Sequence, residues 1–135
     1  MPISADLIGA QVQGEAVEVT LEAVSRFAAA VEQPVCELAH EHVVPHTFPI
    51  TILLTQMSDA LLEAGIDWSR AVHGDQKFTY HRPIRIGDRL LGSTTIESVR
   101  QIAGNEIIGV RTEFTDPVGE AVVSCWSTIV ERGEK

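Results

Sequence analysis

The sequence predicts an α+β fold in which a curved antiparallel sheet wraps around one long central helix. Residues 49–64 (PITILLTQMSDALLEA) are apolar nearly all round, and Pro49 and Gly65 bound them. Several runs rich in β-branched residues follow this segment, with turn signals between them. The chain has 135 residues and no low-complexity linker. This length suits a single domain, here taken as residues 1–135.

The central helix is the strongest local signal in the sequence. Pro49 stands at its first position, where a missing N–H costs least, and Gly65 is a natural C-terminal stop. Its expected apolar face consists of Ile50, Leu53, Leu54, Met57, Leu61 and Ala64, with Ile52 and Leu62 off that face. A helix that is apolar on most sides is usually buried on most sides, so we expect a sheet around it.

A strand and a shorter helix are expected before the central helix. Residues 14–20 alternate in polarity, and Thr20 is a good N-cap for a helix over 21–31. Residues 32–46 then read as an irregular loop rich in His and Glu.

The second half of the chain supplies the sheet. The expected strands are 76–81, 89–102, 106–115 and 120–131, with 82–88 as a turn-rich connection. Gly104-Asn105 and residues 116–119 are the turn signals. A buried helix, preceded by a strand and followed by such a meander, is the outline of a hot-dog fold.

Composition excludes several classes of partner. The net charge of −9 argues against nucleic acid and anionic membranes. No apolar stretch reaches the roughly 20 residues that span a bilayer, and the N-terminus does not resemble a signal peptide. Cys36 and Cys125 fit no zinc spacing and no disulfide framework, so we expect reduced thiols and a cytoplasmic protein.

The charge is unevenly distributed along the chain. Residues 1–67 hold ten acids and one base, whereas residues 68–100 hold six bases and three acids. The basic segment either packs beside the acidic half and neutralises it, or receives the phosphates of a carrier such as coenzyme A or phosphopantetheine.

The longest motif is FTYHRPIRIGDRLLGSTTIESVRQIAGNEIIGVRTEF, followed by GEAVVSCWSTIVER. Together with the upstream RFAAAVEQP and VPHTFPITILL, in that order, it resembles the MaoC-like dehydratase N-terminal domain family over nearly the whole chain. Within this family the chain resembles the non-catalytic subunits of heterodimeric (3R)-hydroxyacyl-ACP dehydratases and the first halves of two-domain MaoC-like enzymes.

The resemblance implies (R)-specific hydration or dehydration of an acyl thioester carried on coenzyme A or acyl carrier protein, without a cofactor. Catalytic relatives carry an Asp/His pair in a pattern like FAxxSGDxNPIH. Here FAAAVEQPVCEL places Gln33 or Val31 at the aspartate and Cys36 at the histidine. The chain therefore lacks the pair, and the resemblance implies a homodimer or a heterodimer with a catalytic MaoC-like subunit.

The start of the central helix matches the family better. Catalytic relatives read VAHGFLTLSLL, and this chain reads VPHTFPITILL, with His46 retained and Thr47 in place of the glycine whose N–H faces the thioester oxygen. The resemblance implies that His46, Thr47 and Phe48 contact substrate and that Ala60 and Ala64 line the acyl tunnel.

Three alternatives to the role of a non-catalytic subunit stay open. Glu37 and His42 have the spacing of an acid/imidazole dyad and could serve a self-sufficient homodimeric hydratase. Asp59 and Glu63 on the central helix could serve a thioesterase, as in some hot-dog enzymes. A non-enzymatic acyl-binding module is the third. The cluster His40, Glu41, His42 and His46 matches no strong metal motif, so we expect no metal site.

Overall fold

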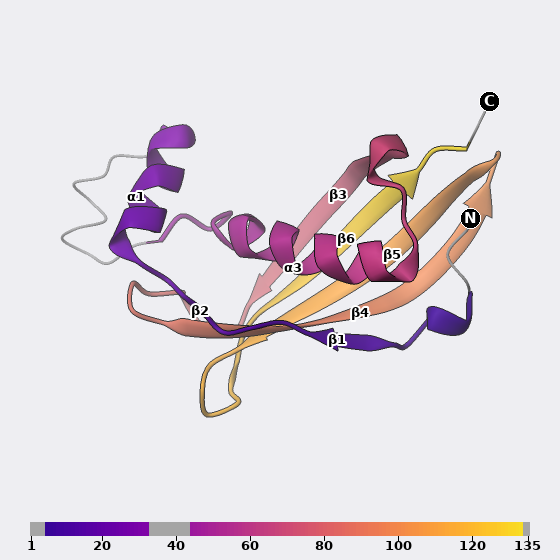
Figure 1. The fold of residues 1–135 in the computed structure, drawn as a ribbon. Coiled ribbons are helices and arrows are strands. Elements are labelled where there is room, and N and C mark those ends of the chain that lie inside the picture. Colours follow the sequence, from indigo (N-terminus) through magenta and orange to yellow (C-terminus); the bar gives the residue numbers. More distant parts are fainter. Residues whose placement is uncertain (1–4, 33–43, 134–135) are drawn as a thin grey trace.

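The computed structural model describes residues 5–32 and 44–133. An antiparallel sheet of six strands curves around helix α3, in the order β1-β4-β5-β6-β3 with β2 also paired to β4 (Figure 1). The elements are η1 (Ala5–Leu7), β1 (Gln11–Gln13), β2 (Val17–Glu18), α1 (Leu21–Ala30), α3 (Pro49–Ala64), η2 (Trp68–Arg70), β3 (Ala71–Tyr80), β4 (Arg89–Ile102), β5 (Asn105–Thr115) and β6 (Ala121–Glu131). This is the hot-dog fold that the sequence predicts.

Helix α1 begins where the capping signal places it. The Thr20 side chain accepts a hydrogen bond from the Ala23 N–H at 3.1 Å, which satisfies one of the free donors of the first turn. Val24 and Ala28 are buried. Phe27 meets Phe48 edge to face with ring centroids 5.7 Å apart, so α1 packs against the start of α3.

The predicted bounds of α3 are confirmed, but its burial is one-sided in the single chain. Leu53, Met57 and Leu61 are fully buried against the sheet. Leu54, which the sequence places on the buried face, is 43% exposed, and Leu62 is 62% exposed. The sheet covers one side of the helix only, so apolar residues on the other side stay open.

The strands predicted at 76–81, 89–102, 106–115 and 120–131 correspond to β3, β4, β5 and β6, with two differences. The β4–β5 turn is Ala103-Gly104, one residue earlier than expected, with positive φ at both residues. Strand β3 starts at Ala71 rather than residue 76, because a bulge at Gly74 interrupts the alternation that marks a strand. Of the strand predicted at 14–20 only Val17–Glu18 (β2) is formed, and a second short strand, β1, lies before it at Gln11–Gln13.

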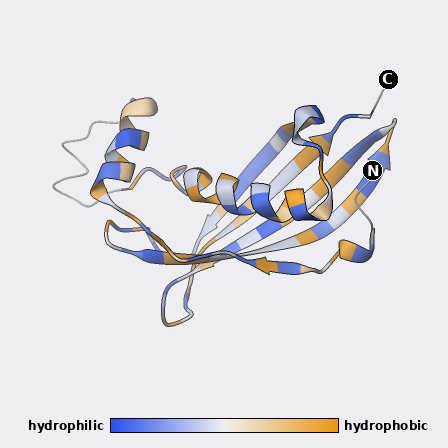
Figure 2. Ribbon diagram, viewed as in Figure 1, coloured by the Kyte–Doolittle hydropathy of each residue, from blue (hydrophilic) through white to orange (hydrophobic). Residues whose placement is uncertain are grey.

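The core lies between α3 and the inner face of the sheet. Hydrophobic positions alternate with hydrophilic ones along the strands (Figure 2), and Ile108, Val110 and Phe114 on β5 are buried. Thr94 and Thr112 are buried on the same face and bond to each other at 2.9 Å. No helix among the described residues has the length and apolar character needed to cross a membrane.

Candidate functional site

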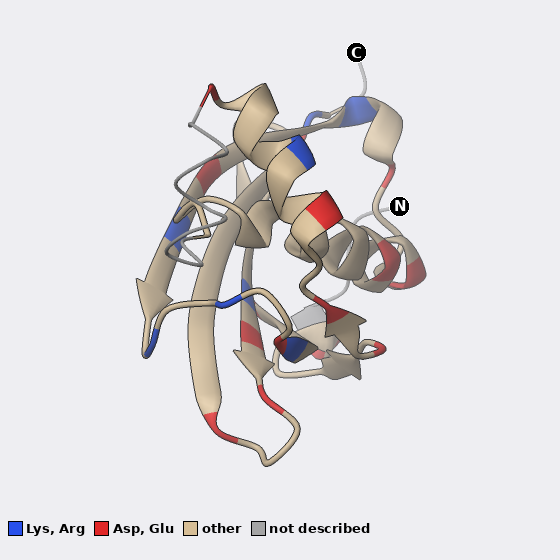
Figure 3. Cartoon of the chain, turned by 90° about the vertical axis from the view of Figure 1, so that its left-hand side faces the viewer, with Lys and Arg blue, Asp and Glu red and all other residues tan. Residues whose placement is uncertain are grey.

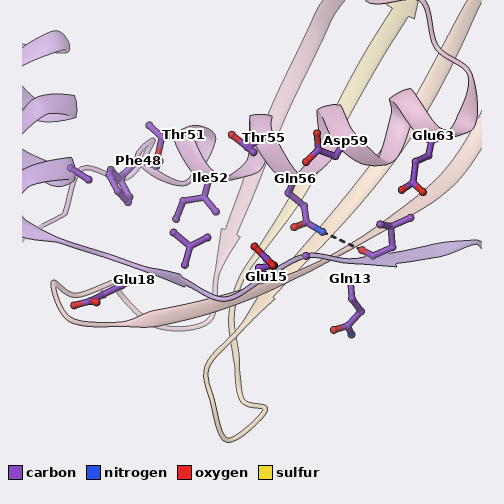
Figure 4. Close-up of a pocket in the computed structure, with 14 residues that line it drawn as sticks. Gln13, Glu15, Glu18, Phe48, Thr51, Ile52, Thr55, Gln56, Asp59 and Glu63 are labelled. Atoms are coloured by element: carbon purple, nitrogen blue, oxygen red, sulfur yellow. Dashed lines mark hydrogen bonds between the residues drawn. The ribbon is translucent and has the colours of Figure 1, made fainter.

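A groove runs between the N-terminal segment and one flank of α3. Its hollow has a volume of about 550 Å³, and 14 residues line it (Figure 4). One wall comes from β1, β2 and the residues between them, and the other from the start of α3 and its turns up to Glu63. The Phe27–Phe48 contact places α1 beside the end of the groove near the α3 N-terminus, where Ala23 of α1 also lines it.

The lining of the groove is apolar with an acidic rim. Phe48, Ile52 and Val17 contribute apolar surface. The four acidic residues are Glu15, Glu18, Asp59 and Glu63. None of the lining residues is Lys or Arg, so nothing here would hold the phosphates of a carrier.

Gln56 reaches across the groove from α3 to the sheet. Its Nε2 donates to Val12 O and to Gly92 O, both at 3.1 Å, and the first of these bonds is drawn in Figure 4. Both partners are acceptors, so only the amide nitrogen can face them, and this fixes the orientation of the side chain. A Cβ atom on Gly14 would collide with the Gln56 amide, which explains the glycine at that position.

A smaller hollow of about 130 Å³ lies farther along α3. Ala60 and Ala64, expected from the family resemblance to line the acyl path, are in its wall together with Leu7, Ala10, Val12, Glu63, Thr94 and Ile96. Phe48 belongs to the larger hollow instead. The structure thus places these three predicted residues along one flank of α3 but in two compartments.

The N-terminus of α3 carries the remaining predicted substrate residues. His46 and Thr47 are exposed in the turn before the helix. The Tyr80 hydroxyl donates to His46 O, and its ring lies 5.6 Å from the His46 ring. Burial raises the pKa of Tyr80, so this hydroxyl stays protonated and can donate. Among the described residues the Thr47 N–H has no acceptor, as is common for the first N–H groups of a helix.

The alternative catalytic residues divide into two groups. Asp59 and Glu63 are exposed one turn apart and line the larger hollow. Within the described part of the chain, neither carboxylate makes a hydrogen bond or ion pair. Glu37 and His42, together with Gln33, Cys36, His40 and Glu41, lie outside the described residues. Val31 is exposed at the C-cap of α1.

Two bases of the basic segment pair with acids of this chain. Arg82 Nη1 lies 2.8 Å from Asp88 Oδ2, and Arg70 Nε lies 3.1 Å from Asp67 Oδ2. Both pairs are local, between residues three and six positions apart in the sequence. Acidic positions of α3 and of the β1–β2 segment gather on one side of the molecule (Figure 3).

Sequence reasoning missed the N-terminal wall of the groove and the role of Gln56. Gln56 bonds to residues 44 and 36 positions away, and no local pattern encodes such a contact. Gly14, in a segment otherwise expected to be a strand, is the one local signal of a close approach.

Comparison with known proteins gives a consistent picture. A family model for the FAS1-like, dehydratase domain region matches residues 6–125. A UPF0336 protein from Streptomyces coelicolor is 44% identical over 98 residues, and the match spans 70% of this chain but 65% of that protein. A UPF0336 protein from Thermobifida fusca is 34% identical, over 99% of this chain and 97% of its own length.

Solved structures show the same similarity. The C-terminal truncated HadBC (3R-hydroxyacyl-ACP dehydratase) complex from Mycobacterium tuberculosis aligns with a TM-score of 0.81 and 25% identity, over 93% of this chain and 98% of that one. A MaoC-like dehydratase aligns with a TM-score of 0.81 and 26% identity, over 94% of this chain and 42% of its own.

Proposed function

This chain belongs to the FAS1-like, dehydratase domain region family, and from that premise we propose that it is the substrate-shaping subunit of an (R)-specific enoyl-thioester hydratase or 3-hydroxyacyl-thioester dehydratase. A partner subunit of MaoC-like type supplies the Asp/His pair. The substrate is an acyl-CoA or an acyl-ACP, and the setting is cytoplasmic.

The observation that carries the proposal is the groove that leads away from the N-terminus of α3. An acyl tail needs an apolar path, and Phe48, Ile52 and Val17 supply one. The absence of bases in its lining fits the tail of the substrate and not the phosphates of its carrier.

The thioester itself belongs at the start of α3. Hydration and dehydration pass through an enolate, whose oxygen is stabilised by N–H groups at a helix N-terminus. Thr47 offers such an N–H beside the exposed His46. The partner's acid and base would then move the protons at the α-carbon and β-carbon. In this scheme Ala60 and Ala64 form the wall of the far end of the path.

The proposal is tested by co-expression with a catalytic MaoC-like protein. We expect a stable heterodimer that hydrates crotonyl-CoA, an activity that neither chain has alone. In that complex Thr47→Pro removes the N–H and is expected to lower kcat about 100- to 1000-fold, the usual effect of losing one oxyanion donor. Thr47→Gly keeps the N–H and should keep most of the rate. Absence of a complex would refute the subunit role.

Assays of the isolated chain distinguish the subunit role from the three alternative functions. We expect no more than a trace rate of crotonyl-CoA hydration. A robust rate that is lost in Glu37→Ala or His42→Ala would instead identify a self-sufficient hydratase. The position of Asp59 and Glu63 in the groove lining favours thioesterase as the second candidate, and thioester cleavage that is lost in Asp59→Ala or Glu63→Ala would identify it. Tight acyl binding without either reaction would indicate a non-enzymatic acyl-binding module.

A further inference from the structure

The turn that leads into α3 contains a carbonyl oxygen, that of His46, to which no backbone N–H of the described residues donates. A helix start would offer this oxygen the N–H of the residue three or four positions on. Three positions on is Pro49, which has no N–H. Four positions on is Ile50, whose N–H donates to Thr47 O at 3.1 Å instead. The sequence therefore leaves His46 O to a donor from elsewhere in the chain.

Tyr80 supplies that donor. Its hydroxyl donates to His46 O although the two residues are 34 positions apart in the sequence. Tyr80 ends β3, where it pairs with Val123 of β6, and its half-buried ring packs against the core. The sheet thus fixes the place from which the hydroxyl acts. Burial raises the pKa of Tyr80, so the hydroxyl keeps the proton that it donates.

The bond to His46 O also orients the Thr47 N–H, because the two groups belong to one peptide unit. A peptide unit is planar, and in the trans form its C=O and N–H point in opposite directions. The His46–Thr47 bond is trans. Holding the oxygen toward Tyr80 therefore points the Thr47 N–H away from the phenol. A donor on the oxygen also polarises the peptide unit, which strengthens its N–H as a donor.

We propose that Tyr80 is a positioning residue that aims the Thr47 N–H at the enolate oxygen, an inference that rests on the proposed function. In this role Tyr80 neither touches substrate nor moves a proton, and it acts only through the peptide unit that it holds. Without the hydroxyl, His46 O would bond to water and the unit could turn. The N–H would still be present, but it would no longer be fixed before the reaction, and fixed donors stabilise a developing charge best.

The competing explanation is that Tyr80 only fastens β3 to the start of α3. Tyr80→Phe removes the hydroxyl and keeps the ring on the core. Thr115→Val removes a different hydroxyl-to-carbonyl hydrogen bond, from Thr115 Oγ1 to Leu91 O at 3.4 Å, which joins β5 to β4. It is the matched control for the loss of one such bond, because Leu91 O lies in the sheet and not at the start of α3.

The first measurement is crotonyl-CoA hydration by the complex co-expressed with a catalytic MaoC-like protein. Tyr80→Phe should lower kcat about tenfold with KM unchanged, the size expected for one hydrogen bond whose effect is felt in the transition state. In a Thr47→Pro background, which has no N–H to position, Tyr80→Phe should cause no further loss. Thr115→Val should keep the wild-type kcat.

The second measurement is the carbonyl carbon resonance of His46 in the isolated, isotope-labelled chain. It should move upfield in Tyr80→Phe, because the carbonyl loses its donor, and stay in place in Thr115→Val. This signal reports the hydrogen bond itself and does not depend on a partner or on turnover.

Four results would overturn this inference and leave the proposed function standing. They are an unchanged kcat in Tyr80→Phe while Thr47→Pro lowers it, a full further loss from Tyr80→Phe in the Thr47→Pro background, an equal loss of kcat in Thr115→Val, and an unmoved His46 resonance in Tyr80→Phe. A kcat that Thr47→Pro leaves unchanged, or the absence of an active complex, would instead overturn the proposed function and the role of Tyr80 with it.

Discussion

Asp88 shows how a single residue holds the connection between β3 and β4. Its Oδ2 accepts from Arg82 Nη1 and from the Arg85 N–H, both at 2.8 Å. Burial by itself raises the pKa of this carboxyl, but the hydrogen bonds from Arg82 and Arg85 outweigh it and the net pKa lies below the ordinary value. The motif RPIRIGD thus encodes a charge-assisted turn that positions β4 for pairing with β1 and β2.

We expect Asp88→Asn to lower the free energy of unfolding by about 1.5–3 kcal/mol at neutral pH, because hydrogen bonds to a charged group are lost. A carboxyl with a depressed folded pKa stabilises above its unfolded pKa, near 3.9, and loses this contribution as pH falls through the folded value. The difference between wild type and variant should therefore be constant from about pH 6 to 8 and shrink below about pH 4. Urea titrations across this pH range would measure the difference in unfolding free energy. A difference that grows as the pH falls would contradict a lowered pKa for Asp88.

Cys125 is predicted to be chemically inert. It is fully buried between β5 and β3, and burial raises the pKa of its thiol to about 12. Because the thiolate is the reactive form, almost none is present at neutral pH. In a Cys36→Ser background, a thiol reagent should label the native protein far more slowly than the protein in denaturant. Equal labelling rates for the native and the denatured protein would show that the β-sheet around Cys125 opens readily.

At the scale of elements, the sequence predicts best where the determining signals are local. Pro49 and Gly65 bound α3, and the Thr20 cap starts α1, because each acts within a few residues of itself. The start of β3 was missed since the bulge at Gly74 breaks its alternation. The groove could not be predicted, because Gln56 and its partners on β1 and β4 come together only in the folded chain.

The β4–β5 turn gives a prediction at this scale. Ala103 has φ 53° and Gly104 has φ 83°, the pattern of a type I′ hairpin turn. A left-handed conformation costs an alanine about 1–2 kcal/mol, whereas asparagine tolerates it. Ala103→Asn should therefore raise the free energy of unfolding by about 0.5–1 kcal/mol. Thermal unfolding would show a higher midpoint, while Gly104→Ala should lower it. A lower midpoint for Ala103→Asn would contradict the turn geometry.

At the scale of the whole molecule, one edge of the sheet and one side of α3 have no neighbour within the chain. β3 pairs with β6 alone and forms the edge of the sheet among the described strands. The exposed apolar residues Leu54 and Leu62 lie on α3, and Val72 lies on β3. An unpaired strand edge beside open apolar surface is a common site of association. The dehydratase domain is therefore expected to work as a pair in which two sheets join.

We predict that the purified chain is a dimer or larger at micromolar concentration, because pairing would satisfy the free β3 edge and cover the apolar side of α3. Val72→Asp places a charge on that edge and should raise the dissociation constant of the dimer at least tenfold, since charged edges oppose strand pairing. Val118→Asp is the matched control, because Val118 is 81% exposed in the β5–β6 turn and should not affect association. Light scattering over a concentration series would measure both variants. A monomeric wild type would contradict pairing through β3, and an equal effect of the two substitutions would place the interface elsewhere.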